Sequence, residues 1–439
     1  MQTVQIGLIG LGNVGTGVVH ILQEHASLLA ERLGAHLELK RVATRHPERR
    51  RTVDLAPHQV SGDVMDLLND PDISIVVELI GGYEPARTYI LEALRRGKHV
   101  VTANKALLAQ HGQEIFETAV ARGCDIGFEA SVGGGIPIIR VIKEGFVANR
   151  FLSISSIING TSNYILSKMT DEGLGFQEAL KEAQELGYAE ADPTFDVEGI
   201  DAAQKIALLT SLAFGSWTPH GDIYTEGISQ LMPLDIAYAG EFGYVVKLLA
   251  LAKYADDQLD VRVHPALVAE NSWLANVKGV YNAVSIRGDM VGQQMLIGRG
   301  AGALPTGSAV VGDVVEVARN LLIGSHGRVP PQAYHAESLA AVTRKDIHDV
   351  ICRYYMRFQV LDRPGVLAAI AGVLGEHAIS IESVIQKGRG HEQDAVVSVV
   401  MMTHEARERS AREALHAIEA LPHVQGAAVC LRVEEAEEH

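Results

Sequence analysis

The apolar positions in the first 130 residues form short runs that alternate with longer amphipathic stretches. Runs of strand length lie at residues 4–9, 37–43, 73–80, 99–102 and 126–130. Patterns of helical period follow at about residues 14–29, 85–96 and 107–122. Alternation of this kind predicts a doubly wound α/β domain, with a parallel sheet covered by helices.

The pattern becomes more mixed after residue 133. We expect a strand at residues 151–158, a helix from about residue 197, a further helix over the apolar stretch 242–255, and strands at 260–268, 280–288 and 295–298. These strands predict a mainly open sheet in an inserted α+β domain at residues 134–300. A helix at about residues 307–322 is expected to pack back on the first domain, which then comprises residues 1–133 and 301–330.

The last 90 residues have a separate pattern. A polar linker at residues 331–349 follows Pro330-Pro331. Strands are expected at residues 353–361, 379–386, 395–402 and 424–433, with helices at 366–376 and 405–421. The order βαββαβ predicts a ferredoxin-like domain at residues 350–439.

Composition narrows the class of protein. A chain of 439 residues, 47% hydrophobic and 21% charged, is typical of a globular enzyme with two or three domains. The net charge of −16 argues against a nucleic-acid partner or an anionic membrane. The three cysteines follow no metal or redox spacing. We also find no signal peptide and no apolar run of roughly 18 residues, so we expect a cytoplasmic protein.

A glycine motif connects the first predicted strand to the first predicted helix. It contains Gly10, Gly12, Asn13, Val14 and Gly15, in the pattern G-x-G-x-x-G. The first glycine allows a tight turn, the second lets backbone approach a pyrophosphate, and the third lets the helix pack on the strand. Because the motif stands between a strand and a helix, it predicts a Rossmann-type dinucleotide site, with a plain glycine turn as the alternative.

The end of the second predicted strand bears on the choice of coenzyme. No acid that would bind ribose hydroxyls stands there, and Arg45 follows, with Arg49, Arg50 and Arg51 close behind. An arginine at this point accommodates a 2′-phosphate, so NADP(H) is favoured and NAD(H) is the alternative coenzyme. A solvated basic loop is the other interpretation.

Three further groups are candidates for chemistry. Thr102 and Lys105 follow a predicted strand, at the edge of a parallel sheet where ligands bind, although Lys105 also suits a surface position. Asp201 and Lys205 are four residues apart and share a helix face with two leucines. This suggests either an exposed ion pair or a partly buried one that is suited to proton transfer. The loop of three glycines at 133–135 fits a hinge or a carbonyl site for a hard cation.

Taken in order, the motifs resemble homoserine dehydrogenase over about the first 330 residues. They are GLGNVG at 10–15, TANK at 102–105, EASVGGGIP at 129–137, NGTSNY at 159–164, GYAEADPTFDVEGIDAAQK at 187–205 and GAGALPTGSAVVGD at 300–313. The last domain, with DRPG at 362–365, resembles an ACT domain. The inserted domain would then bind substrate and form the dimer contact.

The resemblance implies reversible reduction of L-aspartate 4-semialdehyde to L-homoserine, in threonine, methionine and isoleucine biosynthesis. It makes Lys205 the proton donor, held by Asp201, with Lys105 between coenzyme and substrate. The implied substrate-binding residues are Glu190, Asp196, Asp201 and Lys105, and Gly187 and Gly302 would border the coenzyme. A monovalent cation, Na⁺ or K⁺, would be held by Glu129, Val132, Gly134 and Ile136, mostly through backbone oxygens.

The ACT resemblance implies threonine as an effector, near Gly365 and Gln386. A homodimer or homotetramer is expected. Three alternatives stay open: another small-aldehyde reductase on the same scaffold, a nucleotide-dependent amino-acid sensor without turnover, and a C-terminal domain that only dimerises.

Overall fold

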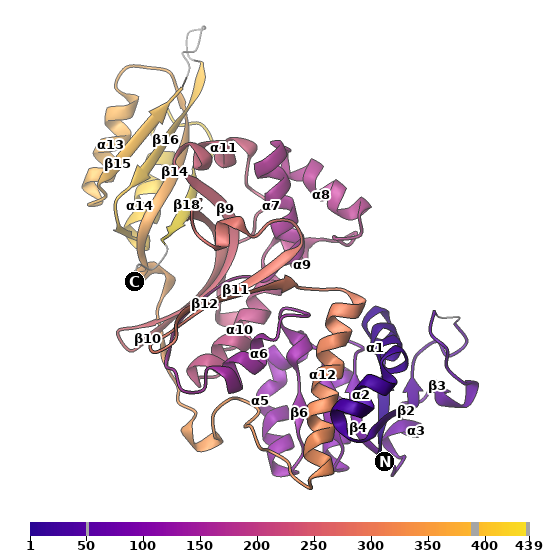
Figure 1. The fold of residues 1–439 in the computed structure, drawn as a ribbon. Coiled ribbons are helices and arrows are strands. Elements are labelled where there is room, and N and C mark those ends of the chain that lie inside the picture. The colour runs from indigo at the N-terminus through magenta and orange to yellow at the C-terminus, as the bar shows by residue number, and fades with distance from the viewer. Residues whose placement is uncertain (50–51, 388–394, 436–439) are drawn as a thin grey trace. The chain divides into compact units, whose positions relative to one another are not determined.

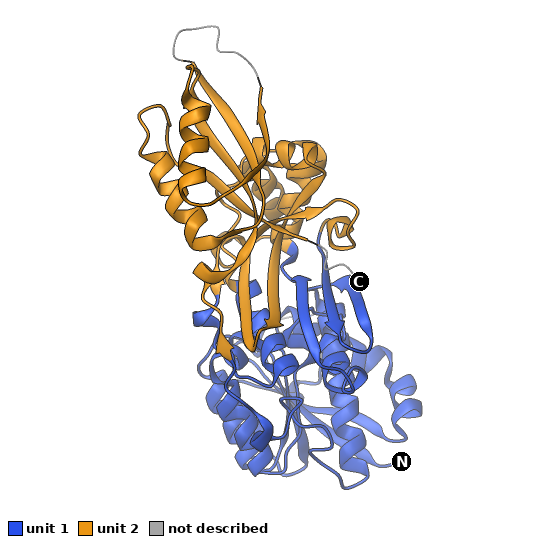
Figure 2. Cartoon of the chain, turned by 90° about the vertical axis from the view of Figure 1, so that its left-hand side faces the viewer, with its two compact units in different colours: residues 1–160, 201–223, 280–342 blue, residues 161–200, 224–279, 343–439 orange. Residues whose placement is uncertain are grey.

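A computed structural model describes residues 1–49, 52–387 and 395–435, so Arg50 and Arg51 of the basic run lie outside the described residues. The chain forms two compact units, coloured separately in Figure 2. Unit 1 comprises residues 1–160, 201–223 and 280–342, and unit 2 comprises residues 161–200, 224–279 and 343–439. The domain boundaries inferred from the sequence stay a prediction.

Unit 1 contains a six-stranded parallel sheet with the order β3-β2-β1-β4-β5-β6 (Figure 1). Its strands are β1 (Thr3–Ile9), β2 (His36–Ala43), β3 (Val60–Ser61), β4 (Ile73–Glu78), β5 (His99–Thr102) and β6 (Ile126–Gly127). The strand order reverses between β1 and β4, which is the crevice where such sheets bind dinucleotides. The doubly wound Rossmann-type sheet is therefore confirmed. The strand expected at 126–130 ends at Gly127, and a 3₁₀ turn (Glu129–Ser131) follows.

Helices α1 and α12 pack together on one face of this sheet. Their buried valines and leucines join those of β1, β2 and β4 in one core. The contact is close, because a Cβ on Gly17 of α1 would lie 2.2 Å from the carbonyl oxygen of Ala303. The return of the late helix to the first sheet is thus as predicted. The helices of the sheet are α1 (Asn13–Glu24), α2 (Ala26–Leu33), α3 (Met65–Leu68), α4 (Ala86–Arg95), α5 (Lys105–Ala121) and α12 (Ala303–Leu322). The helix expected at 14–29 is broken at His25.

The rest of unit 1 leads from the sheet to a buried helix. A short α6 (Ile138–Arg140) continues as a π turn (Val141–Gly145). Three antiparallel strands follow in the order β12-β11-β7, with β7 (Phe151–Ile157), β11 (Tyr281–Gly288) and β12 (Gly292–Arg299). Helix α10 (Ile200–Phe214) is buried at every position from Asp201 to Ala213. A 3₁₀ turn (His220–Asp222) ends this part.

Unit 2 contains a long hairpin where the sequence suggested a helix. Residues 242–255 were expected to be helical, but they form β9 (Tyr244–Ala255), which pairs antiparallel with β10 (Gln258–Ala269). The helix prediction was wrong because positions 246–252 are all buried, so the run carries neither a helical nor an alternating period. The turn uses Asp256 and Asp257, whose φ angles of 52° and 57° match a type I′ hairpin.

The C-terminal part of unit 2 has the predicted βαββαβ order. It comprises β14 (Ile351–Leu361), α13 (Val366–Glu376), β15 (Ile381–Gln386), β16 (Val396–Thr403), α14 (Glu408–Glu419) and β18 (Val429–Glu434), with a short β17 (Ala406–Arg407). The strand order is β18-β14-β16-β15. Strand β18 also pairs with β10, so this domain continues the hairpin's sheet.

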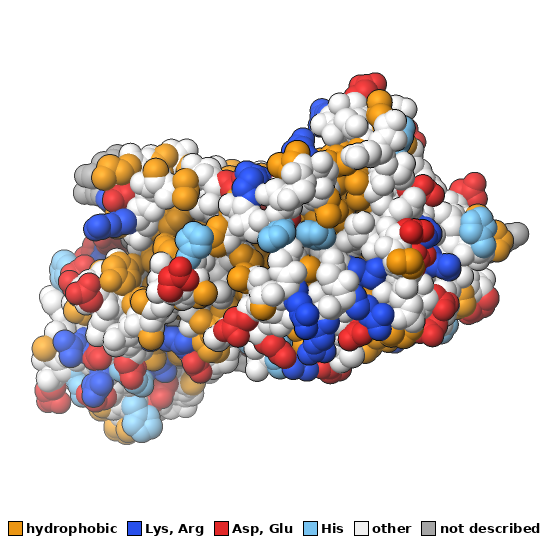
Figure 3. Space-filling view, turned by 90° about the horizontal axis from the view of Figure 1, so that it is seen from below, with side chains coloured by type: hydrophobic (Ala, Val, Ile, Leu, Met, Phe, Trp, Pro, Cys, Tyr) orange, Lys and Arg blue, Asp and Glu red, His pale blue; other side chains and the backbone are white. Residues whose placement is uncertain are grey.

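The remaining elements of unit 2 are short or peripheral. They are α7 (Gly160–Glu172), α8 (Phe176–Glu185), α9 (Thr194–Val197), α11 (Pro233–Glu241), β8 (Tyr224–Thr225) and β13 (Thr343–Arg344). Among the described residues, the chain has no helix with the length and apolar character needed to cross a membrane. Acidic and basic side chains are interspersed on the face shown in Figure 3.

Candidate active site

Asp201 and Lys205 form a buried ion pair on the first turns of α10. The Lys205 Nζ lies 2.6 Å from Asp201 Oδ2, and the two side chains are 11% and 6% exposed. The spacing of four residues explains why they meet, because it places them on the same helix face. The buried interpretation of this pair therefore holds, and the exposed alternative does not.

The loop after β7 and the start of α5 complete the cluster around this pair. Lys205 Nζ donates a second hydrogen bond, of 2.7 Å, to the carbonyl oxygen of Ile158. Asn159 Nδ2 donates to Asp201 Oδ2 at 2.9 Å. Lys105, the first residue of α5, places its Nζ 3.2 Å from Asp201 Oδ1 and keeps its side chain 32% exposed. The structure thus brings the three predicted catalytic residues together.

The positive charges of the two lysines favour the ionised form of Asp201. Burial alone would raise the pKa of Asp201, but attraction to the ammonium groups of Lys205 and Lys105 more than offsets it and lowers the pKa to about 2. Asp201 therefore stays ionised at neutral pH. Lys205 has three N–H donors and, among the described residues, donates to Asp201 and Ile158. One donor is left for an oxygen of a bound molecule.

The glycine turn has the geometry expected of a dinucleotide site. Gly10 has a φ of 101°, and a Cβ there would lie 2.8 Å from the backbone of Leu79. A Cβ on Gly15 would lie 2.2 Å from the Gly10 carbonyl oxygen, whereas one on Gly12 would meet nothing within 4 Å. Gly12 begins α1 without a side-chain cap, and Asn13 and Val14 form the first turn. This open helix N-terminus suits a pyrophosphate.

A buried carboxylate organises the edge of the sheet beside that turn. Glu78, at the end of β4, accepts hydrogen bonds from Ile80 N at 2.7 Å and Thr102 Oγ1 at 2.7 Å. Burial raises its pKa, and these donors partly oppose the rise. Asn104 caps α5 and donates to the Gly82 carbonyl at 2.7 Å. Thr102 thus fixes loops rather than facing open space. Glu78 and Asn104 were not predicted as site residues.

Arg45 is exposed just after β2, in the same unit as the glycine turn. Strand β2 lies next to β1 in the sheet, so this arginine follows the strand adjacent to the one that leads into the glycine turn. In such sheets, a residue at this position binds the ribose or its 2′-phosphate. The phosphate role of Arg45 stays a prediction.

The loop of three glycines approaches the start of α12. Gly133 and Gly134 have φ angles of 71° and 57°, and a Cβ on Gly134 would lie 2.5 Å from the Gly300 carbonyl oxygen. Gly302, with a φ of 129°, begins α12. Only glycine allows this approach and these backbone angles.

Glu129 anchors one end of the same loop. Its carboxylate accepts hydrogen bonds from Ile139 N and Arg140 N, both at 2.8 Å. Burial and repulsion from Asp313 raise its pKa to about 7. Val132 and Ile136, which lie between Glu129 and α6 in the sequence, are both buried. No group of three or more His, Cys, Asp or Glu side chains suited to a metal occurs among the described residues, so a cation here would rely on backbone oxygens.

Asn282 is a buried residue that sequence reasoning missed. Its carboxamide hydrogen-bonds to no residue that the structure describes. It lies against Gly300, where a Cβ would be 2.0 Å from Asn282 Nδ2, and near Gly160, next to Asn159. An unpaired buried amide requires an explanation such as a bound water or ion. No local sequence signal marks it.

Three predicted site residues belong to unit 2. Gly187 has a φ of 74° and is exposed, and Glu190 is exposed. Asp196 lies in α9, half-buried, and its backbone oxygen accepts from Ser162 Oγ at 3.0 Å. Their roles at a substrate or coenzyme stay predictions.

Comparison with known proteins covers almost the whole chain. The family model for homoserine dehydrogenase matches residues 137–315, that for the homoserine dehydrogenase NAD-binding domain matches residues 10–129, and the ACT model matches residues 354–423. A homoserine dehydrogenase of Pseudomonas aeruginosa is 45% identical over 435 residues, which is 99% of this chain and 100% of the relative. That of Bacillus subtilis is 40% identical over 437 residues, 99% of each chain.

Solved structures of similar proteins support the same family. The homoserine dehydrogenase of Thiobacillus denitrificans superposes with a TM-score of 0.91 at 44% identity, over 99% of each chain. A hyperthermophilic archaeal homoserine dehydrogenase in complex with NADPH has a TM-score of 0.60 at 25% identity, over 72% of this chain and 98% of that one. The chain therefore belongs to the homoserine dehydrogenase family, as an oxidoreductase with an NAD(P)-binding domain and a C-terminal ACT domain.

Proposed function

We propose that the chain reduces L-aspartate 4-semialdehyde to L-homoserine with Lys205 as the proton donor, and runs the reverse reaction with Lys205 as the acceptor. The observation that carries this proposal is the contact of the buried Asp201–Lys205 pair with the partly exposed Lys105, in the same unit as the glycine turn. An ammonium with one uncommitted donor beside a fixed carboxylate is suited to stabilise an alkoxide and then protonate it.

When bound, the coenzyme would supply a hydride to the aldehyde carbon. The third N–H of Lys205 would then donate to the negative charge that develops on the substrate oxygen. Asp201 and the Ile158 carbonyl hold the ammonium in that orientation at 2.6 Å and 2.7 Å. Lys105 contacts the other carboxylate oxygen of Asp201. Its positive charge would also stabilise the negative charge on the substrate oxygen.

For the substrate's amino acid end we propose Glu190 and Asp196, with Asp201 and Lys105 at the reacting end. Carboxylates suit an α-ammonium group, and lysines suit oxygen atoms. Gly187 and Gly302 are proposed to border the coenzyme, because neither presents a side chain to obstruct it. If Glu190→Gln leaves the KM for homoserine unchanged, its role is refuted.

We propose NADP(H) as the preferred coenzyme, with NAD(H) as an alternative. The support is the exposed Arg45 after β2 and the absence of an acid at the end of that strand. Gly10, Gly12, Asn13, Val14 and Gly15 would hold the pyrophosphate, and Thr102 and Lys105 would lie at the adjacent edge.

A monovalent cation, Na⁺ or K⁺, is proposed at the loop from Glu129 to Ile136, with Val132 and Gly134 between them. The left-handed glycines turn the backbone sharply, and carbonyl oxygens are ligands that hard cations prefer. The close approach of Gly134 to Gly300 would hold this loop near the start of α12. Equal turnover in choline, sodium and potassium chloride would argue against the site.

We further propose that threonine regulates the enzyme through the ACT domain, near Gly365 and Gln386, and that the protein is a cytoplasmic homodimer or homotetramer. It would serve threonine, methionine and isoleucine biosynthesis. Gly365 has a φ of 92° at the start of α13, which leaves an open loop there. Sedimentation equilibrium decides the oligomer, and a monomer would contradict the proposal.

The reaction is tested by following reduced coenzyme in an absorbance assay. Homoserine, serine, threonine and 2-hydroxybutyrate would be compared with each coenzyme. We expect homoserine to have the highest kcat/KM by a factor of roughly 100 or more, since a site that pairs buried polar groups rejects analogues that leave them unpaired. Equal rates with the other alcohols would favour a general reductase.

A further inference from the structure

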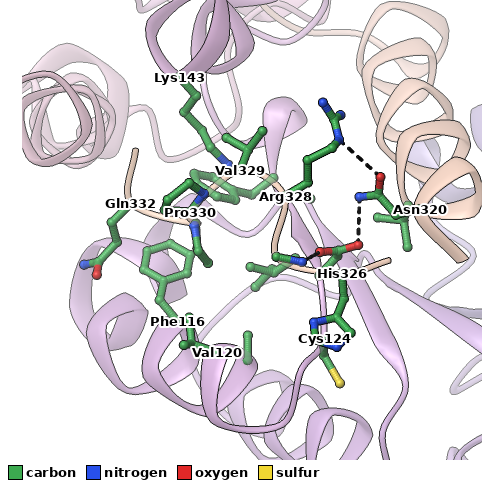
Figure 4. A pocket seen from close by; sticks show the side chains of 18 of the residues that line it. Phe116, Val120, Cys124, Lys143, Asn320, His326, Arg328, Val329, Pro330 and Gln332 are labelled. Carbon is green, nitrogen blue, oxygen red and sulfur yellow. Dashed lines mark hydrogen bonds between the residues drawn. The ribbon is translucent and has the colours of Figure 1, made fainter. Parts of the chain in front are cut away.

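Unit 1 contains a cavity that is separate from the lysine cluster. Its volume is about 580 Å³, within the range of small-molecule sites. The last turns of α5, strand β6, the π turn after α6, the C-terminal half of α12 and residues 326–337 line it. Figure 4 shows Phe116 and Val120 on one side, with Val329, Pro330 and Lys143 on the other. No residue of the Asp201–Lys205–Lys105 cluster lines it.

The wall formed by residues 326–337 is fixed to the rest of the unit. Asp125 accepts hydrogen bonds from Gly327 N at 2.7 Å and from Asn320 Nδ2 at 2.9 Å. Arg328 pairs with Glu316 of α12. Further on, Tyr334 donates to the Ala213 carbonyl at 2.9 Å. The cavity is therefore a built feature of the fold and not a gap under a loose loop.

Lys143 is a half-buried lysine on the cavity wall, in the π turn after α6. It donates no hydrogen bond to any residue that the structure describes, and its Nζ lies 5.3 Å from the centre of the Phe128 ring. In Figure 4 its side chain extends toward Val329 and Pro330. Burial lowers its pKa, and Asp313 and Glu144 oppose this from a distance.

Several other charged groups on the wall have partners of their own. Arg140 lies 3.5 Å from Asp313 and 3.7 Å from Glu144, and the Glu129 carboxylate accepts from two backbone N–H groups. Glu117 accepts from Gln113 at 2.9 Å. A half-buried amine with no acceptor among the described residues can pair with the carboxylate of a ligand, and the apolar part of the wall can cover the rest of that ligand.

We propose that this cavity binds a small organic acid, whose carboxylate accepts a hydrogen bond from Lys143 while a branched or aromatic apolar group lies against Phe116, Val120 and Pro330. The carboxylate would give the ammonium a charge-assisted partner. The apolar group would cover the hydrophobic part of the wall. Free amino acids and plain or 2-oxo acids share this chemistry. The proposal does not depend on the catalytic assignment, because binding is measured without substrate or coenzyme.

Isothermal titration calorimetry of the full chain tests it. The probes are sodium 4-methylpentanoate, its neutral isostere 4-methylpentanamide, and L-leucine. We expect saturable binding of 4-methylpentanoate, and binding of the amide that is weaker by roughly tenfold, about the value of one charge-assisted hydrogen bond. Tighter binding of L-leucine than of 4-methylpentanoate would identify amino acids as the ligand source, and weaker binding would identify plain acids.

The matched variants are Lys143→Met and Lys181→Met. Lys181 is an exposed lysine on α8, so its loss should leave the affinity unchanged. Lys143→Met should weaken 4-methylpentanoate by roughly tenfold and leave the amide unaffected. Val120→Trp, at an exposed rim position, should block the cavity without disturbing the core. Absence of saturable binding to the wild-type chain, or equal affinity in Lys143→Met or Val120→Trp, would overturn the proposal.

Discussion

Replacing Asp201 with asparagine keeps the size of the side chain and removes the charge that two lysines share. The carboxylate lies 2.6 Å from Lys205 and 3.2 Å from Lys105, and accepts from Asn159 at 2.9 Å. Its pKa of about 2, against an ordinary 3.8, corresponds to about 2 kcal/mol of favourable interaction. Loss of the carboxylate also leaves the two ammonium groups facing each other, which costs about 1–2 kcal/mol more in a partly buried site.

We therefore expect Asp201→Asn to destabilise unit 1 by roughly 3–4 kcal/mol, a fall in Tm of about 6–16 °C. Differential scanning calorimetry measures this. The kcat should fall by roughly a hundredfold, because Lys205 loses the group that orients it, while the affinity for coenzyme is retained. Glu172→Gln is the matched control, since Glu172 pairs with Lys168 at the same i,i+4 spacing on an exposed face. Its expected cost is about 0.3–0.5 kcal/mol.

An Asp201→Asn enzyme with a Tm and a kcat like those of the Glu172→Gln control would contradict both expectations. That result would mean that the buried pair neither stabilises the fold nor positions the amine.

Three further predictions concern other parts of the chain. Arg45→Ala should raise the KM for NADPH by roughly tenfold and barely change that for NADH, because the lost contact is to the 2′-phosphate; an equal loss for both coenzymes would contradict this role. Burial raises the pKa of Glu408, but its hydrogen bonds and attraction to Arg432 more than offset this and lower it from 4.5 to about 2. Its folded pKa is thus below its unfolded value, so Glu408→Gln should be destabilising above pH 4.5, with a penalty that disappears as the pH falls to 2. A penalty in urea unfolding that is independent of pH would show that charge is not the cause. Gln386→Ala should raise the threonine concentration for half-inhibition at least several-fold without changing kcat, and unchanged inhibition would place the effector elsewhere.

The sequence predicts the parts of the fold whose patterns are local. Gly10, Gly12 and Gly15 specify the strand–turn–helix unit, and their backbone angles and close approaches agree with that. The helical spacing of Asp201 and Lys205 likewise predicts their contact, which lies within one turn of α10. Each of these inferences depends on residues fewer than six positions apart.

What the sequence does not predict depends on distant partners. The stretch from Tyr244 to Ala255 forms a strand because β10 pairs with it and its central positions are buried. Its buried lysine, Lys247, is tolerated there because the Val277 carbonyl accepts a hydrogen bond from it at 2.6 Å. The residues that fix the active cluster from outside α10, Ile158 and Asn159, are more than 40 positions away from it. No periodicity reports such contacts.

The ACT domain also affects how its role can be tested. Strand β18 pairs with β10, and Arg262 of β10 forms a buried pair with Glu434 of β18. Truncation of the domain would therefore leave a buried arginine without its partner, at a cost of about 3–5 kcal/mol. Point variants such as Gln386→Ala separate regulation from stability, whereas removal of the domain does not.

The proposed mechanism requires that the Lys205 amine gives the proton to the substrate oxygen. Single-turnover kinetics of Lys205→Met beside Lys105→Met, with coenzyme affinity measured by fluorescence, can decide this, because methionine retains the apolar stem of each lysine. We predict that Lys205→Met lowers the rate of reduction by roughly 10²–10⁴ with coenzyme affinity unchanged, and that Lys105→Met has the smaller effect on that rate. Wild-type rates in Lys205→Met, with the large loss in Lys105→Met, would contradict the assignment and give the proton transfer to Lys105.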